Sequence, residues 1–141
     1  MKFFVGIDGG SRGNPGPAAL GVVIRDETGK VVRKDSHYLG TATNNFAEWS
    51  SLDHAVDILI ELAREHGPVE ADVQADSQLV VRQWNGVYRI KEPTLRRIAL
   101  KIRKKLQAHP EITLRLHHVK REYNKEADAL VNRVLDKYSK Q

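Results

Sequence analysis

Apolar and polar positions follow strand-like patterns in the first third of the chain. Residues 2 to 8 are almost continuously apolar, which is typical of a strand buried on both faces. Residues 19 to 25 and 31 to 39 are rich in Val, Ile and Leu, and the polar residues 26 to 30 between them indicate a hairpin turn. The glycines and prolines of residues 9 to 17 are not expected to hold a helix or a long strand. The pattern therefore predicts three antiparallel strands.

The rest of the chain alternates between helical and strand patterns. Residues 44 to 65 have helical periodicity, and Gly67-Pro68 ends it. A strand, a short helix, a helix, a strand and a last helix are expected at about residues 69–75, 77–83, 93–108, 112–119 and 125–138. Strands that alternate with helices pair in parallel through right-handed crossovers. We expect one α/β domain over residues 1–141, a mixed sheet flanked by helices, with Lys137 to Gln141 as the only candidate tail.

Length and composition fit a single soluble domain. The 141 residues are 40% hydrophobic and 29% charged, which excludes intrinsic disorder. No residue is cysteine, so disulfides and thiolate metal sites are excluded and a cytoplasmic location is expected. The apolar runs are too short for a signal peptide or a membrane span. The formal net charge of +5 favours polyanions such as nucleic acid. No protein partner is indicated, and a monomer is expected.

Four carboxylates occupy positions where an acid is unusual. Asp8 ends the first buried strand, where an unpaired charge would be very costly. Glu48 begins the apolar stripe of its helix, and Asp76 follows a strand. Asp128 borders the apolar stripe of the last helix. Each position also has a purely structural interpretation. Asp8 could be an exposed strand end, and Glu48 could be an acid in the first turn of its helix. Asp76 could be a helix N-cap, and Asp128 could be an ordinary residue at the edge of an apolar stripe.

Taken together, the four positions indicate a metal site. The carboxyl ends of parallel strands are where α/β sheets place their sites. Clustered carboxylates repel one another unless cations neutralise them. Oxygen ligands without His or Cys fit Mg²⁺ or Mn²⁺ and do not fit zinc. Two such ions can activate a water and stabilise the leaving oxygen of a phosphodiester. The pattern therefore predicts metal-dependent phosphodiester hydrolysis.

Four sequence blocks resemble those of a known family. In chain order they are DGGSRGNPGP at residues 8–17, TNNFAE at 43–48, DSQ at 76–78 and NKEAD at 124–128. Together they resemble type 1 ribonuclease H over nearly the whole chain. The resemblance implies a ribonuclease H-like fold whose five-stranded mixed sheet has the order 3-2-1-4-5, with the first three strands antiparallel. It also implies an endonuclease that hydrolyses the RNA strand of RNA/DNA hybrids.

The resemblance implies roles for particular residues. By similarity, Asp8 bridges two Mg²⁺ ions, for which Mn²⁺ is a substitute. Asp128 helps to hold the ion that carries the attacking water, and Glu48 and Asp76 help to hold the other. Substrate-binding residues are also implied, with Asn14 and Thr43 at a phosphate of the DNA strand and Asn44, Asn45 and Gln78 in the minor groove. Thr43 or Asn45 is also a candidate cap of the helix that follows.

The chain departs from the family pattern in the loop before the last carboxylate. Many family members carry a His there that is thought to assist product departure, but residues 119–124 form a shorter loop without one. His117 and His118 lie in the preceding strand and are interpreted as strand residues. Lys120 or Arg121 is expected to steady a substrate phosphate. A non-catalytic hybrid-binding module and a nuclease for another substrate, such as double-stranded RNA, stay open as alternatives.

Residues 95–106 form a basic amphipathic helix. Its apolar positions are expected to pack on the sheet: Leu95, Ile98, Ala99, Ile102 and Leu106. Its basic side is interpreted as a solvated face. The alternative is a nucleic-acid contact that partly replaces a basic handle found in some relatives.

Overall fold

The apolar run near the N-terminus forms the central strand of the sheet. In the computed structural model, which describes residues 1–139, β1 (Lys2–Ser11) lies between β2 (Gly16–Arg25) and β4 (Val69–Ala75). The edges are β3 (Val31–Ala42) and β5 (Ile112–His118). The β1–β2 and β2–β3 pairs are antiparallel, whereas β1–β4 and β4–β5 are parallel. The predicted α/β fold and the order 3-2-1-4-5 are confirmed.

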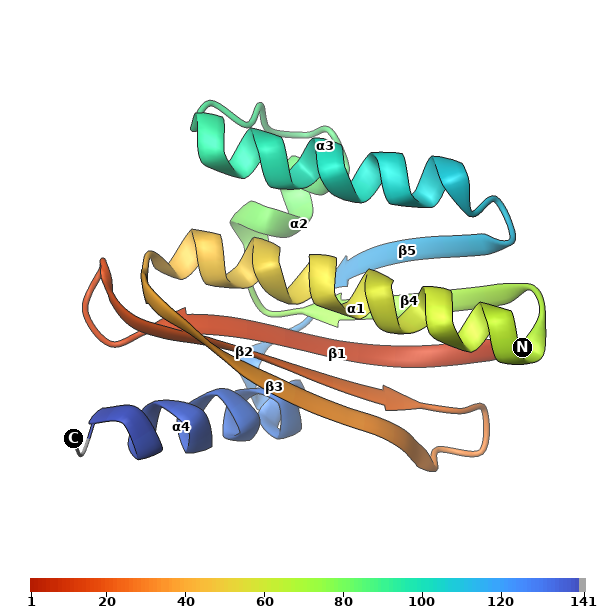
Figure 1. Cartoon of the computed structure of the whole chain (residues 1–141), viewed down its shortest axis with the longest axis horizontal. Coiled ribbons are helices and arrows are strands. Elements are labelled where there is room, and N and C mark those ends of the chain that lie inside the picture. Colours follow the sequence, from red (N-terminus) through yellow and green to blue (C-terminus); the bar gives the residue numbers. More distant parts are fainter. Residues whose placement is uncertain (140–141) are drawn as a thin grey trace.

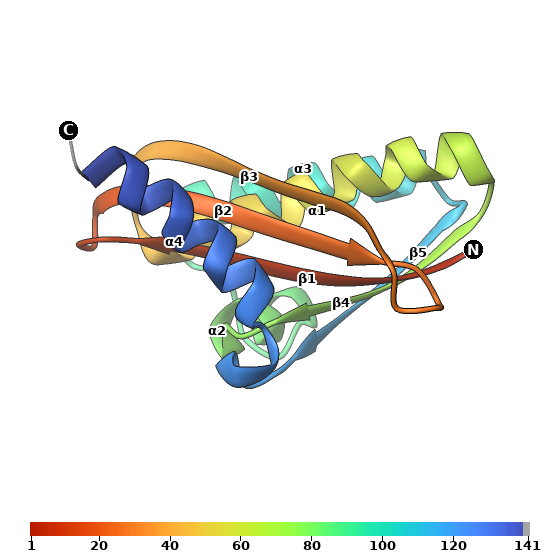
Figure 2. The same cartoon turned by 90° about the horizontal axis from the view of Figure 1, so that it is seen from below.

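Helices cover both faces of this sheet (Figure 1). One face carries α1 (Asn44–His66), α2 (Gln78–Trp84) and α3 (Pro93–Ala108). The other face carries α4 (Lys125–Ser139), which crosses β1, β2 and β3 when seen from below (Figure 2). A single 3₁₀ turn, η1 (Arg121–Tyr123), leads into α4. Of the candidate tail, residues 137–139 belong to α4, and Lys140 and Gln141 lie outside the described residues.

The glycine-rich segment after Asp8 is more regular than its composition indicates. The β1–β2 ladder continues through Gly10 and Ser11, which pair with Ala19 and Ala18. No helix and no long strand lies within residues 9–17, but β1 runs three residues further than the apolar pattern indicates and β2 begins three residues earlier. Only residues 12 to 15 are needed for the turn, and the Arg12 N–H closes it by donating to the Pro17 carbonyl at 2.9 Å.

Side-chain caps set where the helices begin. The Thr43 hydroxyl accepts a hydrogen bond from the Phe46 N–H at 3.1 Å, so Thr43 and not Asn45 caps α1. Ser77 caps α2 by accepting from the Val80 N–H at 3.3 Å. The structural interpretation of Asp76 as an N-cap is therefore wrong, because the next residue occupies that position. Asp76 is left between the end of β4 and the start of α2.

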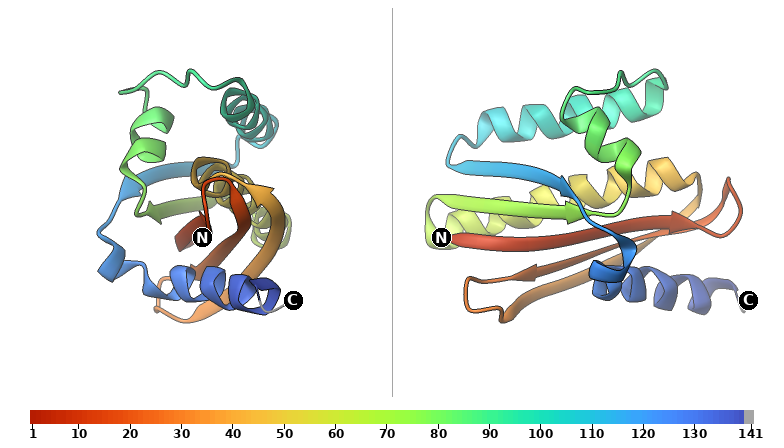
Figure 3. Two further views of the ribbon diagram at one scale, coloured as in Figure 1. Left: turned by 90° about the vertical axis from the view of Figure 1, so that its left-hand side faces the viewer. Right: turned by 180° about the vertical axis from the view of Figure 1, so that it is seen from behind.

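The apolar face of α3 packs on α1 and not on the sheet. Leu95, Ala99 and Ile102 are buried within the main core, and α1 lies between α3 and the strands (Figure 1). The expectation that this face contacts the sheet directly is wrong, because the first helix already covers that part of the sheet. Figure 3 shows the same stacking from two further sides.

Part of the basic side of α3 is paired within the protein. Lys105 lies 2.7 Å from both Asp53 and Asp57 of α1, and Lys101 lies 3.2 Å from Asp53. The Arg103 guanidinium lies over the Trp84 ring at 3.7 Å. These contacts fasten α3 to α1 and α2. Among residues 1–139, no helix combines the length and the apolar character needed to cross a membrane.

Candidate active site

Four carboxylates converge where β1 and β4 end. Asp8 lies near the end of β1, Asp76 follows β4 directly, and Glu48 comes from the second turn of α1. One oxygen from each of these three side chains lies within 4.8 Å of the others. Asp128, in the first turn of α4, lines the same cavity of about 430 Å³. The structure thus brings together the four positions that the sequence singled out.

Glycines let both covering helices approach this end of the sheet. A Cβ at Gly9 would overlap the backbone carbonyl of Ala47 and lie 2.5 Å from the Glu48 nitrogen. A Cβ at Gly21 would lie 2.7 Å from the carbonyl oxygen of Ala127 on the opposite face. The absence of side chains at these two strand positions therefore lets α1 bring Glu48, and α4 bring Asp128, close to Asp8.

A buried asparagine ties the start of α4 to β1. The Asn124 side-chain amide donates a hydrogen bond to the Ile7 carbonyl at 2.8 Å, and Asn124 is 5% exposed. Sequence reasoning placed Asn124 within a family block but gave it no role. Its contact next to Asp8 positions the helix that carries Asp128.

Burial and mutual repulsion raise the pKa values of Asp8, Glu48 and Asp76. Burial, followed by the charge of Asp76, raises the pKa of Asp8 to about 7. Burial and the charge of Asp8 raise the pKa of Glu48 well above its ordinary value. Burial also raises the pKa of Asp76, against the opposing charge of Arg121. The arrangement therefore disfavours simultaneous negative charges on Asp8, Glu48 and Asp76 unless a cation is bound.

Two of the carboxylate oxygens in the cluster lack a hydrogen-bond partner among the described residues. Within residues 1–139, Glu48 Oε2 and Asp76 Oδ2 are buried and have no hydrogen-bond partner. A buried carboxylate oxygen without a hydrogen-bond donor is costly, because it has lost its hydrogen bonds to water. A divalent cation would satisfy both oxygens. A set of carboxylate oxygens is the ligand type that hard divalent cations prefer.

The five expected substrate-binding residues surround this cavity unevenly. Asn44 and Asn45 line it together with the carboxylates. Asn14 and Thr43 are exposed beside it, and the side-chain oxygen Oδ1 of Asn14 accepts a hydrogen bond from the Asn44 N–H at 3.0 Å. Gln78 is exposed at the first position of α2. The loop of residues 11–14 is thus fastened to the start of α1, which places Asn14 beside Thr43, Asn44 and Asn45 on one rim of the cavity.

The shortened loop before α4 contributes one cation to the cavity. Arg121 lines it, and its Nε lies 3.9 Å from Asp76 Oδ2 while 82% of its side chain is exposed. Lys120 and His118 are not among the lining residues, and His117 lies 3.7 Å from Asp72 on the outer face of β4. Of the two loop residues that the sequence left open, Arg121 is therefore the one at the site.

Comparisons with known proteins agree with this geometry. A family model described as reverse transcriptase-like matches residues 6–134. Ribonuclease HI of Halobacterium salinarum is 40% identical over 129 residues, which are 92% of this chain and 62% of that protein. A bifunctional protein of Mycobacterium tuberculosis is 38% identical over 139 residues, which are 96% of this chain and 36% of that protein. The chain thus spans between about a third and three-fifths of these two relatives.

A solved structure is similar over nearly its full length. It is the crystal structure of LC11-RNase H1, a protein isolated from compost, in complex with an RNA/DNA hybrid. The TM-score is 0.90 and the identity 42%, over 96% of this chain and 98% of that one. With the family model, the relatives and this structure in agreement, the chain belongs to the type 1 ribonuclease H family.

Proposed function

We propose that this chain is an endonuclease that hydrolyses the RNA strand of RNA/DNA hybrids, and that residues 1–141 form a single ribonuclease H domain. The proposal rests above all on the convergence of four carboxylates, two of whose buried oxygens lack a hydrogen-bond partner within residues 1–139. The complex of LC11-RNase H1 with a hybrid supports the substrate class. The cytoplasmic location and the monomeric state stay predictions from the sequence.

In this proposal Asp8, Glu48, Asp76 and Asp128 are the catalytic and metal-binding residues. Mg²⁺ is the proposed ion, with Mn²⁺ as a substitute, because both prefer carboxylate oxygens. Bound divalent ions would lower the pKa of the attacking water and neutralise charge at the leaving oxygen. Glu48, Asp76 and Asp128 all influence the pKa of Asp8, so Asp8 lies near the other three and its carboxylate is the one proposed to help hold both ions.

The rim residues would recognise the hybrid. Asn44 and Asn45 line the cavity and offer amide donors and acceptors to the 2′-hydroxyls of the RNA strand, which distinguish RNA from DNA. Gln78 would contact the same groove from the start of α2. Asn14 and Thr43 would bind a phosphate of the DNA strand, using polar atoms exposed beside the start of α1.

Hybrid should be cut about 10³-fold faster than an all-DNA duplex of the same sequence. A site built to hydrogen-bond a hydroxyl rejects an analogue that lacks it by about 10⁴–10⁵-fold at best. The measurement is single-turnover cleavage of RNA/DNA, RNA/RNA and DNA/DNA duplexes with Mg²⁺, with Mn²⁺ and with a chelator. Hybrid binding without cleavage would favour the binding-module alternative, and equal cutting of RNA/RNA would widen the substrate class. Equal cutting of DNA/DNA would contradict the proposal.

Arg121 is expected to bind substrate without transferring a proton. Arg121→Ala should raise KM several-fold and reduce the salt slope of binding by about 1, because one phosphate contact is lost. The kcat value should change little, since an Arg stays protonated near neutral pH. His118→Ala and His117→Ala are the matched controls and should leave both kinetic constants unchanged. Loss of most activity in His118→Ala, with an intact fold, would mean that a strand histidine has taken over the role of the missing loop histidine.

A further inference from the structure

Side chains of the edge strand β3 alternate between the two helical layers. Arg33 lies 2.9 Å from Glu61 of α1, and Asp35 lies 2.6 Å from His54 of α1. Residues on the other face of the strand turn toward α4, where the rings of Tyr38 and Tyr138 stack. His37, two residues after Asp35, therefore shares the face that looks toward α1.

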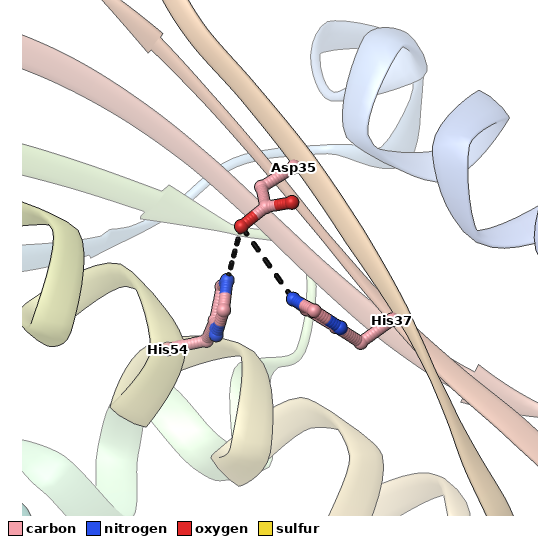
Figure 4. A group of neighbouring side chains, drawn as sticks. All are labelled: Asp35, His37 and His54. Carbon is pink, nitrogen blue, oxygen red and sulfur yellow. Dashed lines mark hydrogen bonds and ion pairs between the residues drawn. The ribbon is translucent and has the colours of Figure 1, made fainter.

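Asp35, His37 and His54 form a compact cluster (Figure 4). The His54 Nε2 lies 2.6 Å from Asp35 Oδ2, and the His37 Nε2 lies 3.5 Å from the same oxygen. One ligand atom from each residue lies within 4.8 Å of those of the other two. The two imidazole rings meet edge to face, with centroids 4.5 Å apart. Two imidazole nitrogens thus approach the same carboxylate oxygen, and all three atoms are within reach of one ion.

A backbone hydrogen bond orients the carboxylate of Asp35 toward the two histidines. Its other oxygen, Oδ1, accepts a hydrogen bond from the Ser36 N–H at 3.1 Å, which leaves Oδ2 directed at the histidines. Partial burial acts to raise the pKa of Asp35, but the hydrogen bond and charge of His54 and the charge of His37 outweigh it, so the pKa lies below the ordinary value. The carboxylate is therefore ionised near neutral pH, as a metal ligand must be.

This cluster is separate from the four carboxylates. Ser36 pairs with Gly21 of β2, which in turn pairs with Asp8 of β1, so Ser36 and Asp8 point to the α4 face of the sheet. The flanking residues Asp35 and His37 point to the opposite face, toward α1. A ligand bound to this cluster would therefore lie across the sheet from the Asp8 side chain.

We propose that Asp35, His37 and His54 bind a zinc ion that fastens the edge strand β3 to α1. Imidazole nitrogens with one carboxylate oxygen are a common ligand set for Zn²⁺, and they are a poor match for Mg²⁺. Zinc bonds of about 2.0–2.2 Å in tetrahedral geometry separate the ligand atoms by roughly 3.3 Å. The 3.5 Å separation already suits this geometry, and the 2.6 Å one needs to open slightly.

The exposure of the cluster leaves room for a fourth ligand. The side chain of His37 is 54% exposed, whereas those of Asp35 and His54 are 29% and 24% exposed. Water can therefore complete the coordination from the solvent side, as it does at zinc sites with three protein ligands. Bound zinc would join residues of two elements that the sequence separates, and so would stabilise the folded state over the unfolded one.

Zinc titration of the chelator-treated full chain tests the proposal. Calorimetry should detect zinc binding at this cluster in the wild-type protein. In both His37→Ala and His54→Ala the affinity should fall by more than about 10–100-fold, because that is the usual cost of losing only a residue that supports a metal ligand. His117→Ala is the matched control, because His117 is equally exposed (54%) and also faces a carboxylate, Asp72, at 3.7 Å. Any zinc bound by the active-site carboxylates is common to all of these variants and cancels in the comparison.

Two further readouts separate a metal site from a simple His–Asp contact. Zinc at about 100 times its Kd should raise the Tm of the wild-type protein by roughly 5 °C more than that of His37→Ala. The imidazole nitrogen resonances of His37 and His54 should shift together in slow or intermediate exchange, while those of His117 stay in place. Wild-type affinity in His37→Ala, whose exposed side chain makes misfolding of the variant implausible, would overturn the proposal, as would unshifted His37 and His54 resonances.

Discussion

Asp8→Asn should lower the rate of hybrid cleavage by at least about 10³-fold while it stabilises the metal-free protein. The amide is nearly isosteric with the carboxylate but carries no charge, so it removes the ligand that interacts with both Glu48 and Asp128. Loss of a single transition-state donor already costs about 10²–10³-fold in other enzymes. Single-turnover cleavage with saturating Mg²⁺ measures the effect.

The stability effect of Asp8→Asn should depend on pH. A carboxyl whose pKa is raised to about 7 on folding destabilises the folded state once it is ionised, because ionisation is easier in the unfolded chain. In chelator the wild-type Tm should therefore fall as pH rises from about 4 to above 7, and Asp8→Asn should remove much of that fall. The expected difference at pH 8 is a few kcal/mol, since a tenfold change in acidity constant corresponds to about 1.4 kcal/mol.

Asp72→Asn is the matched control. Asp72 lies on the neighbouring strand β4 but faces outward, 3.3 Å from Lys2 and 3.5 Å from Arg115. Although burial opposes it, the hydrogen bond and charge of Lys2 and the charge of Arg115 hold the pKa of Asp72 below its ordinary value, so this carboxylate stabilises the folded state near neutral pH. Its loss should leave cleavage unchanged and lower the Tm slightly. Near-normal turnover in Asp8→Asn would rule out the proposed role of Asp8.

Gly9→Ala should lower the Tm by about 10 °C or more. A Cβ at this position would overlap the Ala47 carbonyl and lie 2.5 Å from the Glu48 nitrogen, and these are backbone atoms that cannot rotate away. Overpacking a core costs about 1–3 kcal/mol when side chains can adjust, and a clash with backbone should cost more. Relief of the clash would push the start of α1 away from β1 and carry Glu48 with it. Cleavage should therefore fall even at temperatures where the variant stays folded.

Gly10→Ala separates this clash from a general sensitivity of the glycine-rich segment. The nearest atoms to a Cβ at Gly10 are the Asn44 Oδ1 and Val131 Cγ1, both at 3.9 Å, which is ordinary van der Waals contact. Its Tm should lie within a few degrees of the wild-type value. Thermal melting of both variants side by side decides the matter, and equal Tm values would show that the approach of α1 to β1 is looser than the structure describes.

The local pattern of apolar and polar residues was sufficient to predict most of the strands and helices. The bounds of β4 and α3 agree with the prediction, because turn signals or prolines mark both ends of each segment. The ends of β1 and β2 were placed too far from the turn, since pairing between the two strands overrides the weak preference of glycine for strands. The packing of α3 on α1 could not be read from its amphipathic pattern, which gives a buried face but not the partner of that face.

Asp8 and Glu48 could be singled out because each is an acid within an apolar pattern, Asp8 in a buried strand and Glu48 at the head of a buried helical stripe. Asp76 and Asp128 carried weaker signals and were grouped with them by their expected place at the same end of the sheet. The cluster of Asp35, His37 and His54 had no such signal, because these residues lie on half-exposed surfaces where polar side chains are ordinary. Only the packing of β3 against α1 brings them together. Asn124 was missed as a positioning residue because its hydrogen bond to Ile7 joins opposite ends of the chain.

The two kinds of pairing made by β1 have a consequence for the order in which the chain folds. Its antiparallel partner β2 follows directly, so that Ser11 faces Ala18. Its parallel partner β4 comes after the whole of α1, so that Lys2 faces Glu70. Pairing between distant segments forms slowly, because the entropy of loop closure opposes it before the contacts compensate. On refolding, the hairpins of β1, β2 and β3 can therefore form early, whereas the proposed nuclease activity can return only after β4 and α4 have docked.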